Sequence, residues 1–320
     1  MNSEIIVIPK NEGRSVRSLC WERDELVDWV SGGVRYRLDK TSSDPRVNYA
    51  YRFDKAVVSS DGTYAVIYEQ LGTKGLILKE GCILREINRS FYWASVYEYP
   101  ATVFGLSDGR YVLAHCPDDY RKIEIEELET GARLTSRETK PVDFFHSRLE
   151  VSPSGRFLLS AGWIWHPLDY VQIFDVESTI SNPGLLDQNW NRNMPEDVWE
   201  IHAATFDSDD RIVFTAETYE EENFIGVYSV LENRVLSYSP LEEIAGTLMS
   251  AGTHVIGFFG DPKMIDPWTG KVVQRWADFN TGEQNSCIIH HLEKQPPLAL
   301  DPKNKRFAVA GLDAITVIQS

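Results

Sequence analysis

The sequence has 320 residues, and its hydrophobic fraction of 42% and aromatic fraction of 12% exclude a disordered chain. Acidic residues outnumber basic ones by 48 to 32, so the formal net charge is −16. This balance argues against a nucleic-acid partner, because phosphate binding needs a basic surface. The chain also lacks a signal peptide and any apolar run of about 18 residues. We therefore expect a soluble cytoplasmic protein with no membrane contact.

A strand–turn–strand pattern begins near the N-terminus and recurs along the chain. The first copy, residues 19–30, is degenerate and turns at Asp24, and a third strand is expected at 34–38. The clearest copy, residues 56–67, places a Ser-Ser-Asp-Gly turn between two apolar strands. Later copies occupy residues 103–114, 149–160, 204–215, 246–257 and 298–310.

The spacing of these copies identifies the architecture. Successive first turns are separated by 38 to 55 residues, and a second tight turn follows several of them. Each unit therefore contains four antiparallel strands, which is the content of a β-propeller blade. The sequence predicts an all-β fold, a seven-bladed β-propeller in one domain spanning residues 1–320, with six or eight blades as alternatives.

Three details of the propeller are predicted from individual segments. The strands of the second full unit are expected at 103–106, 110–116, 122–128 and 132–137. An insertion rich in Asn, Gly and Pro is expected at about 180–199, with the fourth strand of its blade placed at 185–190. The N-terminal strand 5–8 is expected to pair with 314–318 in the last blade and close the ring.

The third full unit resembles a tryptophan-aspartate (WD) repeat. His146 precedes a strand, a Ser-Pro-Ser-Gly turn ends at Gly155, and Phe174-Asp175 stands where the Trp-Asp pair of that repeat would be. No Gly-His dipeptide occurs and no unit ends in Trp-Asp, so the chain resembles a divergent member. The resemblance implies a protein-interaction platform.

Three loops between the second and third strands of their units combine acidic and aromatic residues. Aromatic side chains are frequent binding hot spots and carboxylates select basic partners. We expect these loops to bind a basic protein partner, with ordinary solvated loops, and packing of Trp163 and Trp165 between blades, as the alternative. The candidate partner-binding residues are Asp118, Asp119, Tyr120, Trp163, Trp165, His166, Tyr170, Tyr219, Glu220, Glu221 and Glu222.

Catalytic and metal motifs are missing from the sequence. The four cysteines form no CxxC pair, and no nucleophile-elbow, zincin, dinucleotide-binding or P-loop pattern occurs. His146, His202, His290 and His291 precede strands, where a structural hydrogen-bonding role is favoured over a metal site. We therefore expect a non-enzymatic scaffold or adaptor without catalytic residues, cofactor or metal. The alternatives are a lactonase- or hydrolase-like propeller enzyme and an inhibitor of a basic toxin or effector. The oligomeric state stays open.

Overall fold

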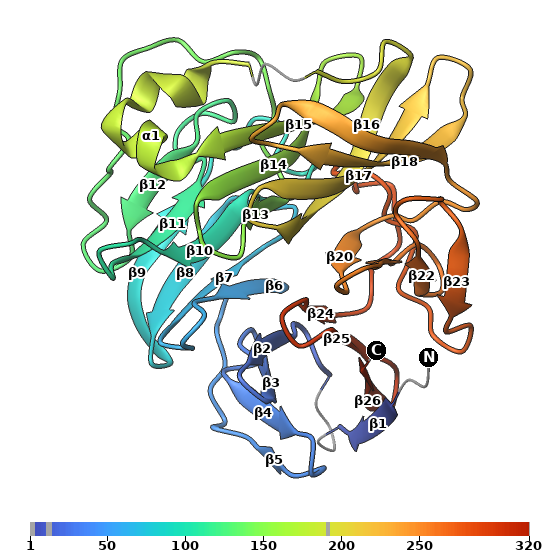
Figure 1. Cartoon of the computed structure of the whole chain (residues 1–320). Helices are drawn as coiled ribbons and strands as arrows, with labels where there is room; N and C mark the ends of the chain where they lie inside the picture. Colours follow the sequence, from blue (N-terminus) through green and yellow to red (C-terminus); the bar gives the residue numbers. More distant parts are fainter. Residues whose placement is uncertain (1–3, 11–14, 190–192, 320) are drawn as a thin grey trace.

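Seven antiparallel sheets form a ring around a central channel in the computed structural model, shown in Figure 1. The structure describes residues 4–10, 15–189 and 193–319. Each sheet is one blade, and the first strand of most blades lines the channel. The prediction of an all-β, seven-bladed propeller is confirmed. Among the described residues, no helix is long and apolar enough to cross a membrane.

The first four blades follow one another in chain order. Blade 1 contains β2 (Cys20–Glu22), β3 (Glu25–Asp28), β4 (Val34–Arg37) and β5 (Ser42–Ser43). Blade 2 contains β6 (Lys55–Val58), β7 (Tyr64–Tyr68), β8 (Lys74–Lys79) and β9 (Cys82–Asn88). Blade 3 contains β10 (Ala101–Gly105), β11 (Tyr111–His115) and β12 (Glu124–Glu127). Blade 4 contains β13 (Leu149–Val151), β14 (Phe157–Ile164) and β15 (Leu168–Asp175).

The last three blades each have four strands. Blade 5 contains β16 (Val198–Ser208), β17 (Arg211–Thr218), β18 (Asn223–Ser229) and β19 (Arg234–Pro240). Blade 6 contains β20 (Leu248–Ser250), β21 (Val255–Gly257), β22 (Lys263–Ile265) and β23 (Val272–Arg275). Blade 7 contains β24 (Leu298–Asp301), β25 (Arg306–Ala310), β26 (Ala314–Gln319) and the N-terminal strand β1 (Glu4–Pro9).

Ring closure occurs as the sequence predicts. Strand β1 pairs antiparallel with β26, from Glu4 opposite Gln319 to Pro9 opposite Ala314. Blue β1 and dark red β26 lie side by side at the bottom of Figure 1. Because β1 is the outermost strand of a blade otherwise formed by the C-terminus, the two ends of the chain hold each other in place.

The hydrophobic core is divided among the junctions between blades. Within the described residues, a cluster of buried side chains lies at each of the seven junctions. At the junction of blades 7 and 1, Ile8 and Val317 share a cluster with Leu26 and Tyr36. Each blade therefore depends on both neighbours for burial of its apolar faces, as in other repeat architectures.

The predicted fourth strand of blade 3 is wrong. Residues 132–137 make an isolated bridge, Glu126 opposite Arg133, and no continuous ladder. The backbone N–H of Ile125 donates to the Thr135 hydroxyl at 2.8 Å, so a side chain takes the place of a ladder carbonyl. Arg137 then turns inward and donates to Asp187 at 2.6 Å. These side-chain bonds replace regular strand pairing at this edge.

The predicted fourth strand of blade 4 is also wrong. The short 3-10 helix η1 (Pro183–Asp187) covers the first half of the segment expected at 185–190, and helix α1 (Val176–Ser181) precedes it. Asp175 caps α1 by accepting the backbone N–H of Ser178 at 2.9 Å, which favours helix over strand. Trp190, at the end of the predicted strand, lies outside the described residues.

Removing the buried side chain of the closing strand should destabilise the protein. Ile8 is fully buried at the junction of blades 7 and 1, so Ile8→Ala should lower the free energy of unfolding by about 2–4 kcal/mol. Val7, on the same strand, faces solvent, and Val7→Ala should cost less than about 1 kcal/mol. Urea denaturation measures both, and equal losses would contradict the closure described here.

Candidate functional site

The loops between second and third strands share one face of the ring with the segments that join successive blades. We call this the loop face. One of the joining segments, residues 280–297 before blade 7, reaches across the channel mouth, and we call it the strap. Its Cys287 carbonyl accepts the Glu98 N–H at 3.0 Å, and Ile288 bridges Tyr97 at the start of blade 3. The strap thus links the blade 6–blade 7 connection to the opposite side of the ring.

A column of stacked rings rises from the interior to the loop face. Trp163 is 2% exposed and stacks on buried Phe145, with ring centroids 3.9 Å apart. Phe145 stacks on Tyr120, also at 3.9 Å, and Tyr120 stacks on Tyr92 at 5.1 Å. The column therefore supports exposed rings from below with a rigid aromatic base.

The top of this column is an exposed aromatic patch, which we define as Phe91, Tyr92, Trp93 and Trp165. Phe91 is 86% exposed, and Trp165 is 38% exposed. Trp93 contacts Trp165 edge to face with centroids 5.7 Å apart. Three of the four residues come from the connection between blades 2 and 3, which the sequence prediction did not include. Their only sequence signal is the consecutive run Phe-Tyr-Trp outside any repeat.

A buried arginine holds that connection in place. Arg89 donates to the carbonyl of Gly72 at 2.7 Å and to that of Ala94 at 2.6 Å. Its guanidinium also lies over the rings of Tyr97 and Tyr99, 4.7 and 4.8 Å from their centroids. These bonds tie the residue after the aromatic run to the β7–β8 turn and so hold residues 91–93, although they form no strand.

A second exposed feature, the acidic lobe, lies on blade 5. It consists of Glu196, Asp197, Trp199, Tyr219, Glu220, Glu221 and Glu222, all exposed. The two segments are neighbours, because Val198 pairs with Thr218 and the Tyr219 N–H donates to the Asp197 carbonyl at 3.3 Å. The rings of Trp199 and Tyr219 lie 4.8 Å apart. None of the five carboxylates forms a salt bridge with a described residue.

The remaining candidate partner-binding residues differ in charge compensation, hydrogen bonding and exposure. Asp118 pairs with Arg133, and Asp119 pairs with Arg121 at 2.6 Å, so their charges are largely compensated. Tyr120 donates to Asp143 at 2.7 Å. His166 is exposed at the tip of the β14–β15 hairpin. Tyr170 is partly buried on β15.

The histidines singled out in the sequence also differ in burial and hydrogen bonding. His146 is buried and hydrogen-bonded at both ring nitrogens, to the Ser160 hydroxyl and the Arg121 carbonyl, each at 3.1 Å. Burial lowers the pKa of His146 to about 3, which fits the structural role expected from sequence. His290 and His291 are exposed on the strap.

His202 instead faces carboxylates at the junction of blades 4 and 5. Its Nδ1 lies 3.7 Å from Asp169 and its Nε2 lies 3.4 Å from Glu217. Burial opposes protonation, but Asp169, together with Glu200 and Glu217, outweighs it and raises the pKa of His202. Ser286 of the strap donates to Asp169 at 2.9 Å.

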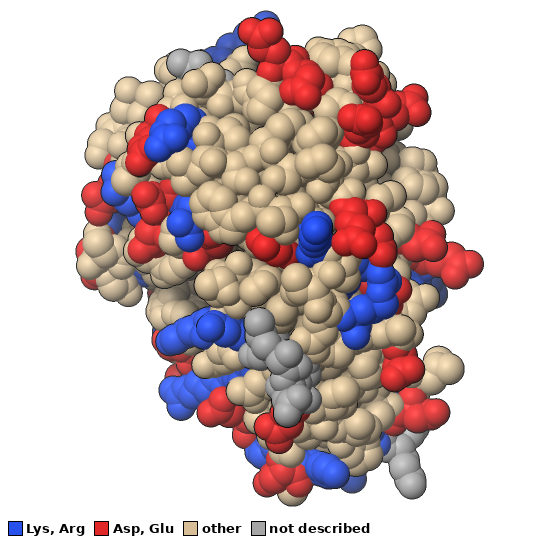
Figure 2. Space-filling model, turned by 45° about the vertical axis from the view of Figure 1, so that its right-hand side comes forward, with Lys and Arg blue, Asp and Glu red and all other residues tan. Residues whose placement is uncertain are grey.

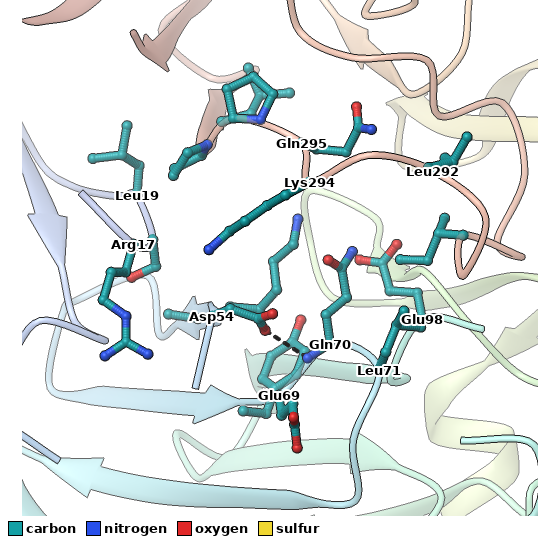
Figure 3. Close-up of a pocket in the computed structure, with 18 of the residues that line it drawn as sticks. Arg17, Leu19, Asp54, Glu69, Gln70, Leu71, Glu98, Leu292, Lys294 and Gln295 are labelled. Atoms are coloured by element: carbon teal, nitrogen blue, oxygen red, sulfur yellow. Dashed lines mark hydrogen bonds between the residues drawn. The ribbon is translucent and has the colours of Figure 1, made fainter. Parts of the chain in front are cut away.

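Two hollows lie beside the strap. A cleft of about 440 Å³ is lined by residues of blades 1 and 2 and by the strap. Figure 3 shows the Lys294 side chain extending across it toward Arg17, above Asp54, whose carboxylate accepts the Gln70 N–H at 2.7 Å. The channel itself encloses about 490 Å³ between the inner strands. Both hollows contain charges of both signs.

Comparison with known proteins supports the fold. No family model and no curated protein matches the sequence. A chain from the crystal structure of the mitotic checkpoint complex is 10% identical, with a TM-score of 0.61 over 99% of this chain and 93% of that one. Our chain has the fold of a divergent WD-repeat-like β-propeller. Because 766 chains of solved structures match, this fold alone does not select a function.

The two tryptophans of the β14–β15 hairpin should respond differently to truncation. Trp163→Ala removes a buried ring stacked on Phe145 and should cost about 3–5 kcal/mol of stability. Trp165→Ala removes a ring at the surface and should cost about 1 kcal/mol or less. Chemical denaturation of both variants measures the difference. Similar losses would mean that Trp165 is structural and not part of an exposed patch.

A carboxylate in the channel wall should make stability depend on pH. Burial raises the pKa of Glu150 to about 7, although its carboxylate accepts the Phe206 N–H and the Thr205 hydroxyl, each at 3.0 Å. Below pH 4.5 both the folded and unfolded chains hold this proton. As pH rises from about 4.5 to 7, the unfolded chain releases it first, so wild-type stability falls.

The measurement compares wild type with Glu150→Gln, which stays neutral. Between pH 4.5 and 8, wild type should lose on the order of 1–3 kcal/mol relative to this variant, since one pKa unit is about 1.4 kcal/mol. Glu220→Gln, at an exposed position, is the matched control and should follow wild type. Parallel pH profiles for wild type and Glu150→Gln would show that Glu150 does not titrate in this range.

Proposed function

We propose that this protein is a cytoplasmic, non-enzymatic interaction scaffold that binds a basic protein partner through its loop face. The propeller fold, and its likeness to a chain of a solved protein complex, fit a protein-interaction scaffold in general. The choice of surface and of partner chemistry rests on the distribution of charge and exposed rings. A net charge of −16 also disfavours nucleic acid and anionic membrane surfaces as partners.

The acidic lobe is the observation that carries this proposal. Its five exposed carboxylates have no salt-bridge partner among the described residues, whereas many other surface acids of this chain are paired. Figure 2 shows acidic side chains gathered at the upper right of the view with few basic ones among them. Uncompensated negative charge attracts a positively charged surface and speeds its encounter.

The exposed rings supply the second part of the recognition. Trp199 and Tyr219 lie within the acidic lobe, and the aromatic patch lies on the same face over blades 2 to 4. Exposed aromatic side chains on a rigid base lose little entropy on binding and form favourable contacts with Lys and Arg side chains. A partner with basic residues spread along one surface therefore fits both features.

Charge reversal in the lobe should weaken partner binding. The triple variant Glu220→Lys, Glu221→Lys and Glu222→Lys should lower affinity at least 10-fold, because it replaces attraction by repulsion. It should also reduce the dependence of affinity on salt. The experiment captures proteins from a host extract with wild type and variant, identifies those retained by wild type, and measures their affinities after purification.

The matched control carries the same change in charge away from blade 5. Glu4, Glu80 and Glu86 are exposed on blades 7 and 2, so Glu4→Lys, Glu80→Lys and Glu86→Lys together should leave capture intact. A partner lost from the lobe variant and kept by this control supports the proposal. Retention of every partner by the lobe variant, or equal loss from both variants, would overturn it.

A further inference from the structure

Three side chains of the types that bind metal ions converge at the junction of blades 4 and 5. Asp169 lies on β15, and Glu200 and His202 lie on β16, which packs against β15 in the next blade. One ligand atom from each residue lies within 4.8 Å of the others. Asp169 and His202 are buried, at 4% and 8% exposure, so the arrangement is held by the fold.

The histidine at this junction has unmet bonding capacity. The buried Nε2 of His202 has no hydrogen-bond partner among the described residues, although Glu217 Oε2 lies 3.4 Å from it. Its Nδ1 is 3.7 Å from Asp169 Oδ2, which is too long for a hydrogen bond. Two ligand atoms that each lie about 2.0–2.1 Å from a tetrahedral zinc ion are roughly 3.4 Å apart. The observed separation therefore needs little contraction to accept an ion.

The second nitrogen of the ring has a suitable neighbour for this role. Glu217 on β17 stands opposite Glu200 in the ladder, and its Oε2 lies 3.4 Å from Nε2 of His202. Metal-binding histidines commonly direct their other ring nitrogen to a carboxylate, which fixes the tautomer and the ring orientation. Glu217 is therefore placed to position the ring and not to bind the ion itself.

Charge at the junction favours a divalent cation. Asp169, Glu200 and Glu217 contribute three negative charges, and Arg148, 4.0 Å from Asp169, contributes one positive charge. With neutral His202 the balance is −2, which one divalent ion neutralises.

We propose that Asp169, Glu200 and His202 bind a first-row divalent metal ion such as Zn²⁺, with Glu217 as a positioning residue. One imidazole and two carboxylates form a mixed nitrogen and oxygen set, which suits Zn²⁺ better than Mg²⁺. The strap closes the site, since Ser286 donates to Asp169 and the Cys287 thiol lies 3.5 Å from the same carboxylate oxygen. The site does not depend on the proposed protein partner.

The test is a titration of the full-length, chelator-treated protein with Zn²⁺ in a calorimeter, with Mg²⁺ as a comparison. Wild type should bind one Zn²⁺ per chain and bind Mg²⁺ far more weakly. His202→Ala and Asp169→Asn should each weaken Zn²⁺ binding roughly 100-fold, and Glu217→Gln about 10-fold. Circular dichroism and thermal melting establish that each variant is folded. If His202→Ala does not fold, Glu200→Gln, at a partly exposed position, takes its place.

The exposed histidine pair on the strap provides the matched control. His290 and His291 are adjacent, with ring centroids 5.4 Å apart, and offer two imidazoles outside the proposed site. The double variant His290→Ala and His291→Ala should keep wild-type affinity. Loss of Zn²⁺ binding in this control with retention in His202→Ala would overturn the proposal. Equal binding by all variants, or no stoichiometric binding by wild type, would overturn it as well.

Discussion

The pairing of β1 with β26 is the contact on which the rest of the ring depends. Every blade buries its apolar faces only against its two neighbours, so a gap at one junction would expose the faces of blades 1 and 7 together. The six pairs between Glu4–Pro9 and the last strand remove that gap without a covalent link. They also cover a strand edge that would otherwise be free to pair with another chain.

A closed ring separates the residues that build the scaffold from those that act on other molecules. Repeated apolar positions fill the junctions, whereas the exposed rings and unpaired carboxylates lie in segments that differ from blade to blade. Buried Arg89 shows how such a segment is held, because its bonds to backbone carbonyls take the place of a strand ladder. The rigidity of the loop face thus comes from side chains that are specific to each connection.

The parts of this fold that repeat were predictable, and the parts that do not repeat were not. Turn residues such as Gly62 and Gly155 have positive φ angles of 77° and 78°, so they mark the blades directly in the sequence. The edges of blades 3 and 4 escaped prediction because single side chains, Thr135 and Asp175, replace strand pairing there. The cluster around Asp169 and His202 escaped because its members lie on different blades and meet only through the packing of β15 on β16.

The strap couples the local stability of blades that are distant from one another in the ring. In a propeller each blade contacts only its two neighbours. Local unfolding of one blade therefore affects the far side of the ring only through every intervening junction. The strap spans the diameter, from the connection before β24 to Glu98 and Asp169. It therefore connects blades on opposite sides of the ring by direct contacts. Blades 3 and 4 and blade 7 should therefore open together in hydrogen exchange, although two blades separate them on each side of the ring.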